Sequence, residues 1–279
     1  ETPLASSDGE TPLVAGTVSA LTTASGSQRS HASLDTSVAV VPADGAVDVT
    51  VTVENTSAEP VELEAIRPFD GAQTAFTPTD RVFEHGYQSW SPTGTQRLDE
   101  WFPGESAQNR PQMTDLAAPV DARSSHAVTA FVGDAGELTL GFLDHETYLT
   151  RFDVRTGADS VRLTATCPGD GVTVSPGASR ESATLRIDAS RSVADGLRHV
   201  AATVGSRMDA RTSRSAPTGW CSWYHYFTAV TTADVRAAVD ALDEWGVPVD
   251  VVQIDDGYET AFGDWRTLAD GFDDMRALR

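Results

Sequence analysis

The sequence predicts a multidomain protein in which an all-β antiparallel sandwich is followed by the first βαβ portion of a parallel α/β domain. Two observations predict this class. Up to about residue 190, short apolar segments alternate with clusters of Gly, Asp, Asn and Ser, as in antiparallel strands joined by turns. After residue 217, a strand, a helix and a second strand follow one another closely, which is the order of a βαβ unit.

The sandwich domain is predicted over residues 1–190. Within residues 47–55, valines at every second position alternate with Asp, Thr and Glu, so one face of this strand belongs to a core and the other to solvent. Several short strands of this kind, separated by turn residues, are typical of a β-sandwich. The seven segments that carry the prediction are 38–41, 47–55, 61–69, 126–133, 138–143, 160–166 and 183–189.

A change of period follows the sandwich. Val193, Leu197, Val200, Val204 and Met208 succeed one another at steps of three or four residues, which makes one apolar stripe along a helix. The polar stretch "RTSRSAPT" then ends the pattern. The sequence therefore predicts a helical linker over residues 191–216 and a second domain from residue 217.

The second domain begins with a short strand in "TGWCSW" (218–223). Thr231 and Asp234 have the spacing of a helix N-terminal cap, and Gly246 followed by Pro248 predicts the end of that helix. The helix would bury a face made of Val235, Val239, Leu242 and Trp245. The next segment, "VDVVQI" (249–254), is almost continuously apolar, as expected of a strand covered on both faces. The two strands should be parallel neighbours.

The composition excludes several functions. The chain has 279 residues and a formal net charge of −21, and each of its 20 basic residues is an arginine. An acidic surface without lysine is typical of a protein hydrated in concentrated salt, so we expect a halophilic, haloarchaeal source; an Arg-rich genome is the alternative. Nucleic acid is not an expected partner, because phosphate contacts need clustered basic residues. No apolar run is long enough to span a bilayer, and we expect a soluble protein.

Asp255 and Asp256 directly follow the second predicted strand. In parallel barrels the ligand site lies at the carboxyl ends of the strands. Carboxylates accept strong hydrogen bonds from hydroxyls, and Trp223 and Tyr224 are rings of the kind that pack on sugars, so these residues indicate a carbohydrate subsite. The alternatives are a plain Asp-Gly turn, a divalent metal site, for which too few oxygen ligands lie nearby, and a thiol nucleophile at Cys221, which lacks an orienting group.

Four segments together resemble one glycosidase family. "GWCSWYHYF", "VPVDVVQIDDGYE" and "FGDW" in the second domain, and "HGYQSWSPTG" (85–94) in the first, resemble the α-galactosidase (melibiase, raffinose-cleaving) family of glycoside hydrolases. The resemblance implies an N-terminal β-supersandwich, and it implies that residues 217–279 begin a catalytic (β/α)8 TIM barrel. A complete barrel has about 250 residues, so we expect a C-terminally incomplete, truncated chain.

The resemblance also implies roles for named residues. Asp255 and Asp256 would bind the axial 4-hydroxyl and the 6-hydroxyl of the sugar, and Trp223 and Tyr224 would shape the same pocket. Trp90, on a sandwich loop, would reach the mouth of that pocket, with a core or interface role as the alternative. Gly263 and Trp265 match the "GDW" loop, which we expect to be mainly structural.

The implied activity is the retaining hydrolysis of terminal α-galactosides in oligosaccharides. Such enzymes use an Asp nucleophile and a second carboxyl as acid and base, and in this family both lie on later strands, the nucleophile in a Lys-x-Asp type motif. This sequence has no lysine, so we expect the chain alone to lack catalytic residues and to be inactive. No cofactor and no metal are implied.

Several questions stay open at the level of sequence. A non-catalytic carbohydrate-binding or assembly module built on the sandwich is the alternative function. The motifs do not distinguish galactose from N-acetylgalactosamine. A homo-oligomer mediated by the sandwich is compatible with the family resemblance. A cytoplasmic location is expected, with secretion still open because the sequence begins with Glu1.

Overall fold

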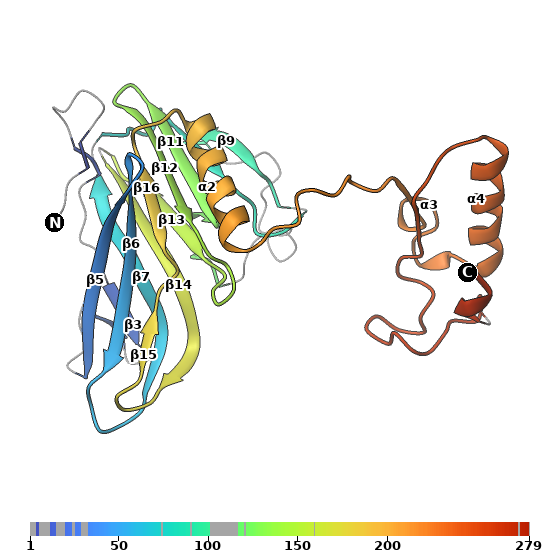
Figure 1. Ribbon diagram of the computed structural model, residues 1–279, viewed down its shortest axis with the longest axis horizontal. Coiled ribbons are helices and arrows are strands. Elements are labelled where there is room, and N and C mark those ends of the chain that lie inside the picture. The colour runs from blue at the N-terminus through green and yellow to red at the C-terminus, as the bar shows by residue number, and fades with distance from the viewer. Residues whose placement is uncertain are drawn as a thin grey trace. The chain divides into compact units, whose positions relative to one another are not determined.

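The computed structural model divides the chain into two compact units, Glu1–Ala210 and Arg211–Arg279, and each is described by itself (Figure 1). The structure describes residues 33–73, 75–89, 91–100, 117–119, 121–158, 160–272 and 274–278. Before residue 33 it describes the backbone of the short strands β1 (Leu4–Ala5), β2 (Pro12–Val14), β3 (Ala20–Thr23) and β4 (Gly26–Gln28).

The first unit consists mainly of two antiparallel sheets, as Figure 1 shows. In order across the first sheet, the described strands are β10 (Arg123–His126), β13 (Arg151–Thr156), β14 (Val161–Val174), β7 (Val61–Gln73), β3 and β4. Across the second they are β15 (Ser179–Glu181), β6 (Ala46–Asn55), β16 (Leu185–Asp188), β12 (Gly136–Phe142), β11 (Val128–Gly133), β8 (Arg81–Glu84) and β9 (Gly94–Arg97). Strand β5 (Leu34–Ala43) pairs with β6 over its whole length.

One apolar core joins the two sheets. Val49, Val51 and Val53 of β6 are buried, whereas the residues between them reach solvent, which confirms the predicted alternation. Leu163 and Phe152, from the other sheet, belong to the same buried cluster. Burying an apolar side chain of this size contributes about 1.5–3 kcal/mol, so the two inner faces hold the sheets together as a β-sandwich, as predicted.

Helix α2 (Val193–Arg207) packs on strands β12 and β11 of the sandwich. Small residues allow the close approach: a Cβ at Gly196 would lie 2.4 Å from Oγ1 of Thr139, and one at Gly141 would lie 2.5 Å from Cγ1 of Val200. Val200 is buried in this contact. The segment predicted as a linker over 191–216 therefore contains a helix of the first unit, and the boundary between the units follows residue 210.

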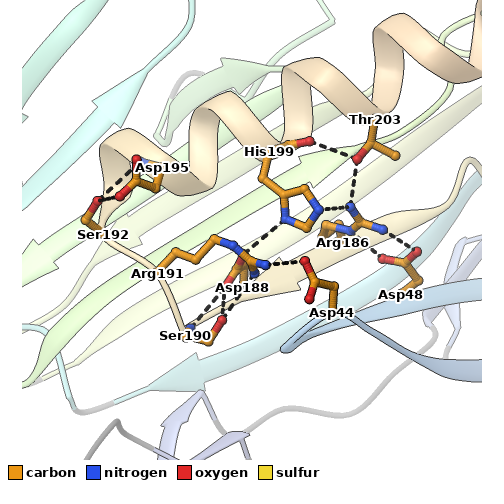
Figure 2. Close-up of polar contacts among 10 residues, drawn as sticks. All are labelled: Asp44, Asp48, Arg186, Asp188, Ser190, Arg191, Ser192, Asp195, His199 and Thr203. Carbon is orange, nitrogen blue, oxygen red and sulfur yellow. Dashed lines mark hydrogen bonds and ion pairs between the residues drawn. The ribbon is translucent and has the colours of Figure 1, made fainter.

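Charged groups reinforce the contact between α2 and the sheet (Figure 2). Nε and Nη2 of Arg186, on β16, donate to the two carboxylate oxygens of Asp48 on β6 at 2.8 and 2.9 Å. Nη1 of Arg186 donates to Oγ1 of Thr203 on the helix at 2.8 Å and lies 3.2 Å from Nε2 of His199. Nδ1 of His199 is 3.7 Å from a carboxylate oxygen of Asp188. The Arg186 and Asp48 side chains are only 7% and 12% exposed, so solvent screens this bidentate pair weakly.

The second unit contains the predicted βαβ order. Strand β17 (Gly219–Cys221) pairs in parallel with β18 (Val251–Gln253), with the register Gly219↔Val251. Between them lie α3 (Trp223–Tyr226), the 3-10 turn η1 (Phe227–Ala229) and helix α4 (Thr232–Glu244), and a further 3-10 turn, η2 (Met275–Leu278), follows later. The parallel pairing that the sequence predicts is therefore confirmed.

Both ends of α4 follow the predicted signals. Thr231 and Asp234 form a reciprocal capping box, in which each side chain accepts a hydrogen bond from the other residue's backbone N–H. At the other end Gly246 has φ +63°. Its N–H donates to the carbonyl of Asp243, and the N–H of Val247 donates to that of Leu242. This is the Schellman arrangement, which satisfies the last carbonyls of a helix.

Helix α4 and strand β18 are more exposed to solvent than the sequence predicts. Val235 is buried with Val230 and Phe272, but Trp245, on the predicted buried face, is 73% exposed, and Val251 of β18 is 46% exposed. Among the described residues after Arg211, the two paired strands are followed by turns and an isolated bridge, so no further strand or helix layer covers these faces. A closed barrel is not formed by the described residues.

None of the helices formed by the described residues combines the length and apolar character needed to cross a bilayer.

Candidate active-site edge of the second unit

The parallel register brings the segments after β17 and β18 to one edge. Because Cys221 pairs with Gln253, Ser222 lies beside the start of the segment that carries Asp255. The N–H of Ser222 donates to the carbonyl of Gln253 at 3.1 Å, and its buried hydroxyl accepts from the N–H of Asp255 at 2.9 Å. These two bonds hold the predicted site segment against the end of the neighbouring strand.

The carboxylate of Asp255 accepts hydrogen bonds from three donors. The side-chain amide of Gln253 donates to Oδ2 at 2.8 Å, the thiol of Cys221 donates to the same oxygen at 3.4 Å, and the N–H of Asp256 donates to Oδ1 at 2.9 Å. The last of these bonds is the main cause that lowers the pKa of Asp255 below its ordinary value. Donors favour the charged form, so Asp255 is held as an oriented anion.

The next carboxyl, Asp256, has the opposite electrostatic environment. Burial raises the pKa of Asp256, and a hydrogen bond to the side chain of Glu259 and the charges of Glu259 and Asp255 add to the effect. The pKa values of these two adjacent acids are therefore displaced in opposite directions. Displacement of this kind is a feature of functional sites.

A hollow of about 610 Å³ borders the loop that follows Asp256. Glu259 lines it and is 6% exposed, while Phe262, another lining residue, is 72% exposed. The hollow is open to solvent, and neither Asp255 nor Asp256 lines it. Its other lining residues are Thr228, Gly257, Thr260, Ala261, Ala269 and Asp270.

The aromatic residues predicted for the site lie on the segment after Ser222. Trp223 begins α3, is partly buried and packs edge-on against Phe227, with ring centroids 5.3 Å apart. Tyr224 is 85% exposed. Among the hydrogen bonds of the described residues, none joins either ring to Asp255 or Asp256. Trp90, the predicted residue of the sandwich loop, lies outside the described residues.

The "GDW" loop is a turn built by Asp264. Its Oδ1 accepts from the N–H groups of Arg266 and Thr267, both at 3.2 Å, and bonds with Thr267 and Arg266 lower the pKa of Asp264. Trp265 is 67% exposed. The carboxylate of this loop is therefore occupied by its own backbone, and within the described part of the chain no three His, Cys, Asp or Glu side chains form a metal-binding group.

The chain therefore belongs to a class of proteins in which an antiparallel β-sandwich unit is followed by a βαβ unit. Acidic residues lie at the carboxyl end of the second strand of that βαβ unit. Comparison with known families then gives a match for residues 211–275, to the family described as "Raffinose synthase or seed imbibition protein Sip1". The matched range contains Asp255, Asp256 and every described contact of their side chains.

Comparison with solved structures finds a similar fold in chains described as galactosidases. The galactosidase domain of an alpha-galactosidase-sucrose kinase is similar with a TM-score of 0.51 at 11% identity, covering 81% of this chain and 32% of that chain. A GH36 alpha-galactosidase from Geobacillus stearothermophilus, in complex with 1-deoxygalactonojirimycin, gives a TM-score of 0.49 at 12% identity over 81% and 32%. The chain thus spans about a third of the length of these structures, and the first of these likenesses supports the predicted fold class.

Four residues of this edge are not predicted as site residues by the sequence: Ser222, Cys221, Gln253 and Glu259. The first three become neighbours of Asp255 only through the parallel register of β17 and β18. The predicted βαβ unit already implies that the two strands are parallel neighbours. Residues directly after the first strand could therefore have been predicted to lie beside Asp255. Glu259 is a single acid in a loop, where its backbone forms an isolated bridge with Leu268.

Proposed function

We propose that this chain provides sugar-binding residues of an α-galactosidase-related glycosidase acting on terminal α-galactosides. The observation that carries the proposal is the pair Asp255 and Asp256 at the carboxyl end of β18, held beside the end of β17 by Ser222. The family match over 211–275 and the likeness in fold to a galactosidase domain support it. Residues 217–279 would then be the start of a TIM barrel, as the family resemblance implies.

In this proposal the two aspartates accept hydrogen bonds from neighbouring hydroxyls, the axial 4-hydroxyl and the 6-hydroxyl. A carboxylate accepts only, and sugar hydroxyls are donors of matching chemistry. Asp255 is suited to this role because its donors orient it as an anion. Trp223 and Tyr224 offer ring surface to the apolar face of the sugar, and the exposed ring of Tyr224 is free to contact it.

The geometry favours binding over bond cleavage for these acids. A retaining glycosidase needs two carboxyls about 5–5.5 Å apart on either side of the scissile bond. Asp255 directly precedes Asp256 in the chain, and neighbouring residues at the end of a strand point to different sides, so the two carboxyls are poorly placed to flank one bond. We therefore assign recognition to Asp255 and Asp256, and neither the nucleophile nor the acid and base of a retaining mechanism.

Galactosyl transfer is a second candidate, favoured because the matched family is described as one of raffinose synthases or seed imbibition proteins. In a retaining mechanism a covalent glycosyl-enzyme forms first, and either water or another sugar can accept the glycosyl group. Binding of the galactosyl unit is common to both outcomes, so the proposed role of the two aspartates is the same. A sandwich module that binds carbohydrate without catalysis is the third outcome.

The test uses the 279-residue chain with methyl α-galactoside for binding and a nitrophenyl α-galactoside for turnover. We expect binding without turnover. Asp255→Asn should weaken binding about 10- to 100-fold, because hydrogen bonds to a charged group are worth about 1.5–3 kcal/mol. Asp264→Asn is the matched control: the amide keeps the turn, and binding should be unchanged.

Three results would contradict the proposal. Absence of binding to any α-galactoside would exclude the sugar site. Equal affinity of wild type and Asp255→Asn would remove Asp255 from it. Turnover that Asp255→Asn abolishes would show that this aspartate takes part in cleavage, contrary to the assignment made above.

A further inference from the structure

Asp255 lies on the side of the β17–β18 pair that faces away from α4. Ile254 packs with the apolar cluster that contains Val235 of the helix, and successive side chains of an extended segment point to opposite sides. Asp255 therefore shares its side with Gln253, to which it is hydrogen-bonded. Cys221, the partner of Gln253 in the parallel register, lies on the same side, because its thiol also reaches Asp255.

The hydrogen bonds of Asp255 use most of its capacity as an acceptor. A carboxylate offers about four lone pairs, two on each oxygen. Oδ2 accepts from the side-chain amide of Gln253 at 2.8 Å and from the thiol of Cys221 at 3.4 Å, and Oδ1 accepts from the N–H of Asp256 at 2.9 Å. No other donor of the described residues reaches either oxygen. One lone pair, on Oδ1, is therefore left for a ligand.

The strand pair holds the donors and the carboxylate in place. The N–H of Ser222 donates to the carbonyl of Gln253 at 3.1 Å, and the hydroxyl of Ser222 accepts from the N–H of Asp255 at 2.9 Å. These bonds fix the backbone of both residues beside the end of β17, where Cys221 lies. A carboxyl group otherwise rotates over a broad range, and a group oriented before binding loses less conformational freedom when a ligand arrives.

We propose that Gln253 and Cys221 are positioning residues that occupy Oδ2 of Asp255, so that Asp255 accepts one sugar hydroxyl, through Oδ1. The number of hydroxyls rests on the proposed function, whereas the orientation of the carboxylate concerns the chain alone. A second hydroxyl of the same sugar must then be accepted by another group, and Asp256 is the next acid in the chain.

The orientation is tested by titrating Asp255 in the full chain by carboxyl-carbon NMR, with Asp255→Asn used to assign the signal. Gln253→Met keeps a side chain of similar length and removes the donor, so the midpoint of Asp255 should rise, because donors favour the anion. Cys221→Ala should also raise it, whereas Cys221→Ser, which keeps a donor, should not. Val251→Met is the control: it places the same new side chain on the same side of β18 and removes no donor.

Deoxy sugars test the number of hydroxyls. The affinities of methyl α-galactoside and of its 4-deoxy and 6-deoxy analogues are measured by calorimetry for the wild type and Asp255→Asn. The variant should bind the parent sugar and one analogue more weakly than the wild type does. It should bind the other analogue equally well, because that analogue lacks the hydroxyl that Asp255 accepts. Gln253→Met should follow the same pattern with a loss of about 2- to 10-fold.

The possible outcomes separate the positioning role from the proposed function. An Asp255 midpoint that stays in place in Gln253→Met and in Cys221→Ala would overturn the positioning role, and if one variant does not fold, the other decides. A partial loss with both deoxy analogues would show that Asp255 accepts two hydroxyls, contrary to the proposal. If the midpoints rise as expected but no galactoside binds, the orientation of Asp255 stands and the proposed function fails.

Discussion

In the second unit, neighbouring groups give two aspartate side chains different pKa values. Asp255 receives donors and has a lowered pKa, whereas Asp256 meets another acid and has a raised one. The same reasoning applies to the two cysteines, of which Cys167 is buried in the sandwich core and Cys221 is partly exposed.

Alkylation should distinguish these cysteines. Burial raises the pKa of Cys167 from 9.0 to about 12, and the thiolate is the reactive form. Under native conditions at about pH 8, iodoacetamide should modify Cys221 and spare Cys167, and both should react in denaturant, as peptide mass mapping would show. Because the folded-state pKa is the raised one, Cys167 contributes stability that is complete below about pH 9 and is lost as the pH rises toward 12. Native modification of Cys167 would contradict this prediction.

Gly257 is required by both conformation and space. It has φ +112°, and a Cβ there would lie 2.6 Å from Cα of Thr228. Gly257→Ala should destabilise the second unit by about 2–4 kcal/mol, from backbone strain and the clash together. Gly263, with φ +88° and open space around it, is the control: Gly263→Ala should cost about 1–2 kcal/mol. Urea unfolding followed by tryptophan fluorescence measures both, and equal losses would contradict the role given to Thr228.

At the scale of elements, helix α2 is attached to the sandwich by close packing and by buried ions. The contact of Gly196 with Thr139 leaves no room for a larger side chain. Arg186 also holds the helix on the sheet, because its guanidinium donates to both Asp48 of the sheet and Thr203 of the helix (Figure 2). These contacts explain why a segment with a linker-like position in the sequence is part of the first unit.

Removing one partner of the buried pair should be strongly destabilising. Asp48→Ala leaves the guanidinium of Arg186, 7% exposed, without its carboxylate, and breaking such a pair costs about 3–5 kcal/mol. Arg198→Ala breaks the Arg198–Asp195 pair on the same helix, whose side chains are 75% and 65% exposed, and should cost at most about 1 kcal/mol. Chemical denaturation of the first unit tests this, and similar losses in the two variants would refute it.

All seven predicted strand segments overlap observed strands, and six of them place apolar residues in the core. The exception is 38–41 in β5, where Val38, Val40 and Val41 are exposed. Strand β13 was not predicted. Its Arg151 and Asp153 are polar residues at every second position, yet both are buried and paired at 2.9 Å, so the solvent face that the pattern would require does not exist. Charges that are satisfied inside a sheet cannot be recognised from the sequence alone.

The candidate site was predicted in part, for a related reason. Asp255 and Asp256 follow an apolar run, and the βαβ order places them at an edge of the sheet. Ser222 reaches Asp255 through the register of β17 and β18. This contact has no local signal, because it depends on how two separate segments of the chain meet.

For the whole molecule, repulsion between acidic residues is expected to limit stability. The net charge is −21, and salt shortens the range of repulsion between charges from about 10 Å at 0.1 M to about 3 Å at 1 M. The melting temperature should therefore rise between these KCl concentrations, by about 2–4 °C for each kcal/mol of repulsion removed. A neutral osmolyte at equal osmolality is the control and should raise it less. A melting temperature that is constant or falls with KCl would count against repulsion as a limit on stability.

The short parallel sheet of the second unit has a consequence for handling the protein. A sheet of two strands carries an outer row of backbone donors and acceptors on each strand, and β18 also presents the half-exposed side chains of Val251 and Val252. Such rows act as templates onto which another extended peptide can be added. The edges of the sheet formed by β17 and β18 can therefore pair with further strands. In concentrated solutions the added strand can come from another copy of the chain, which would lead to polymerisation.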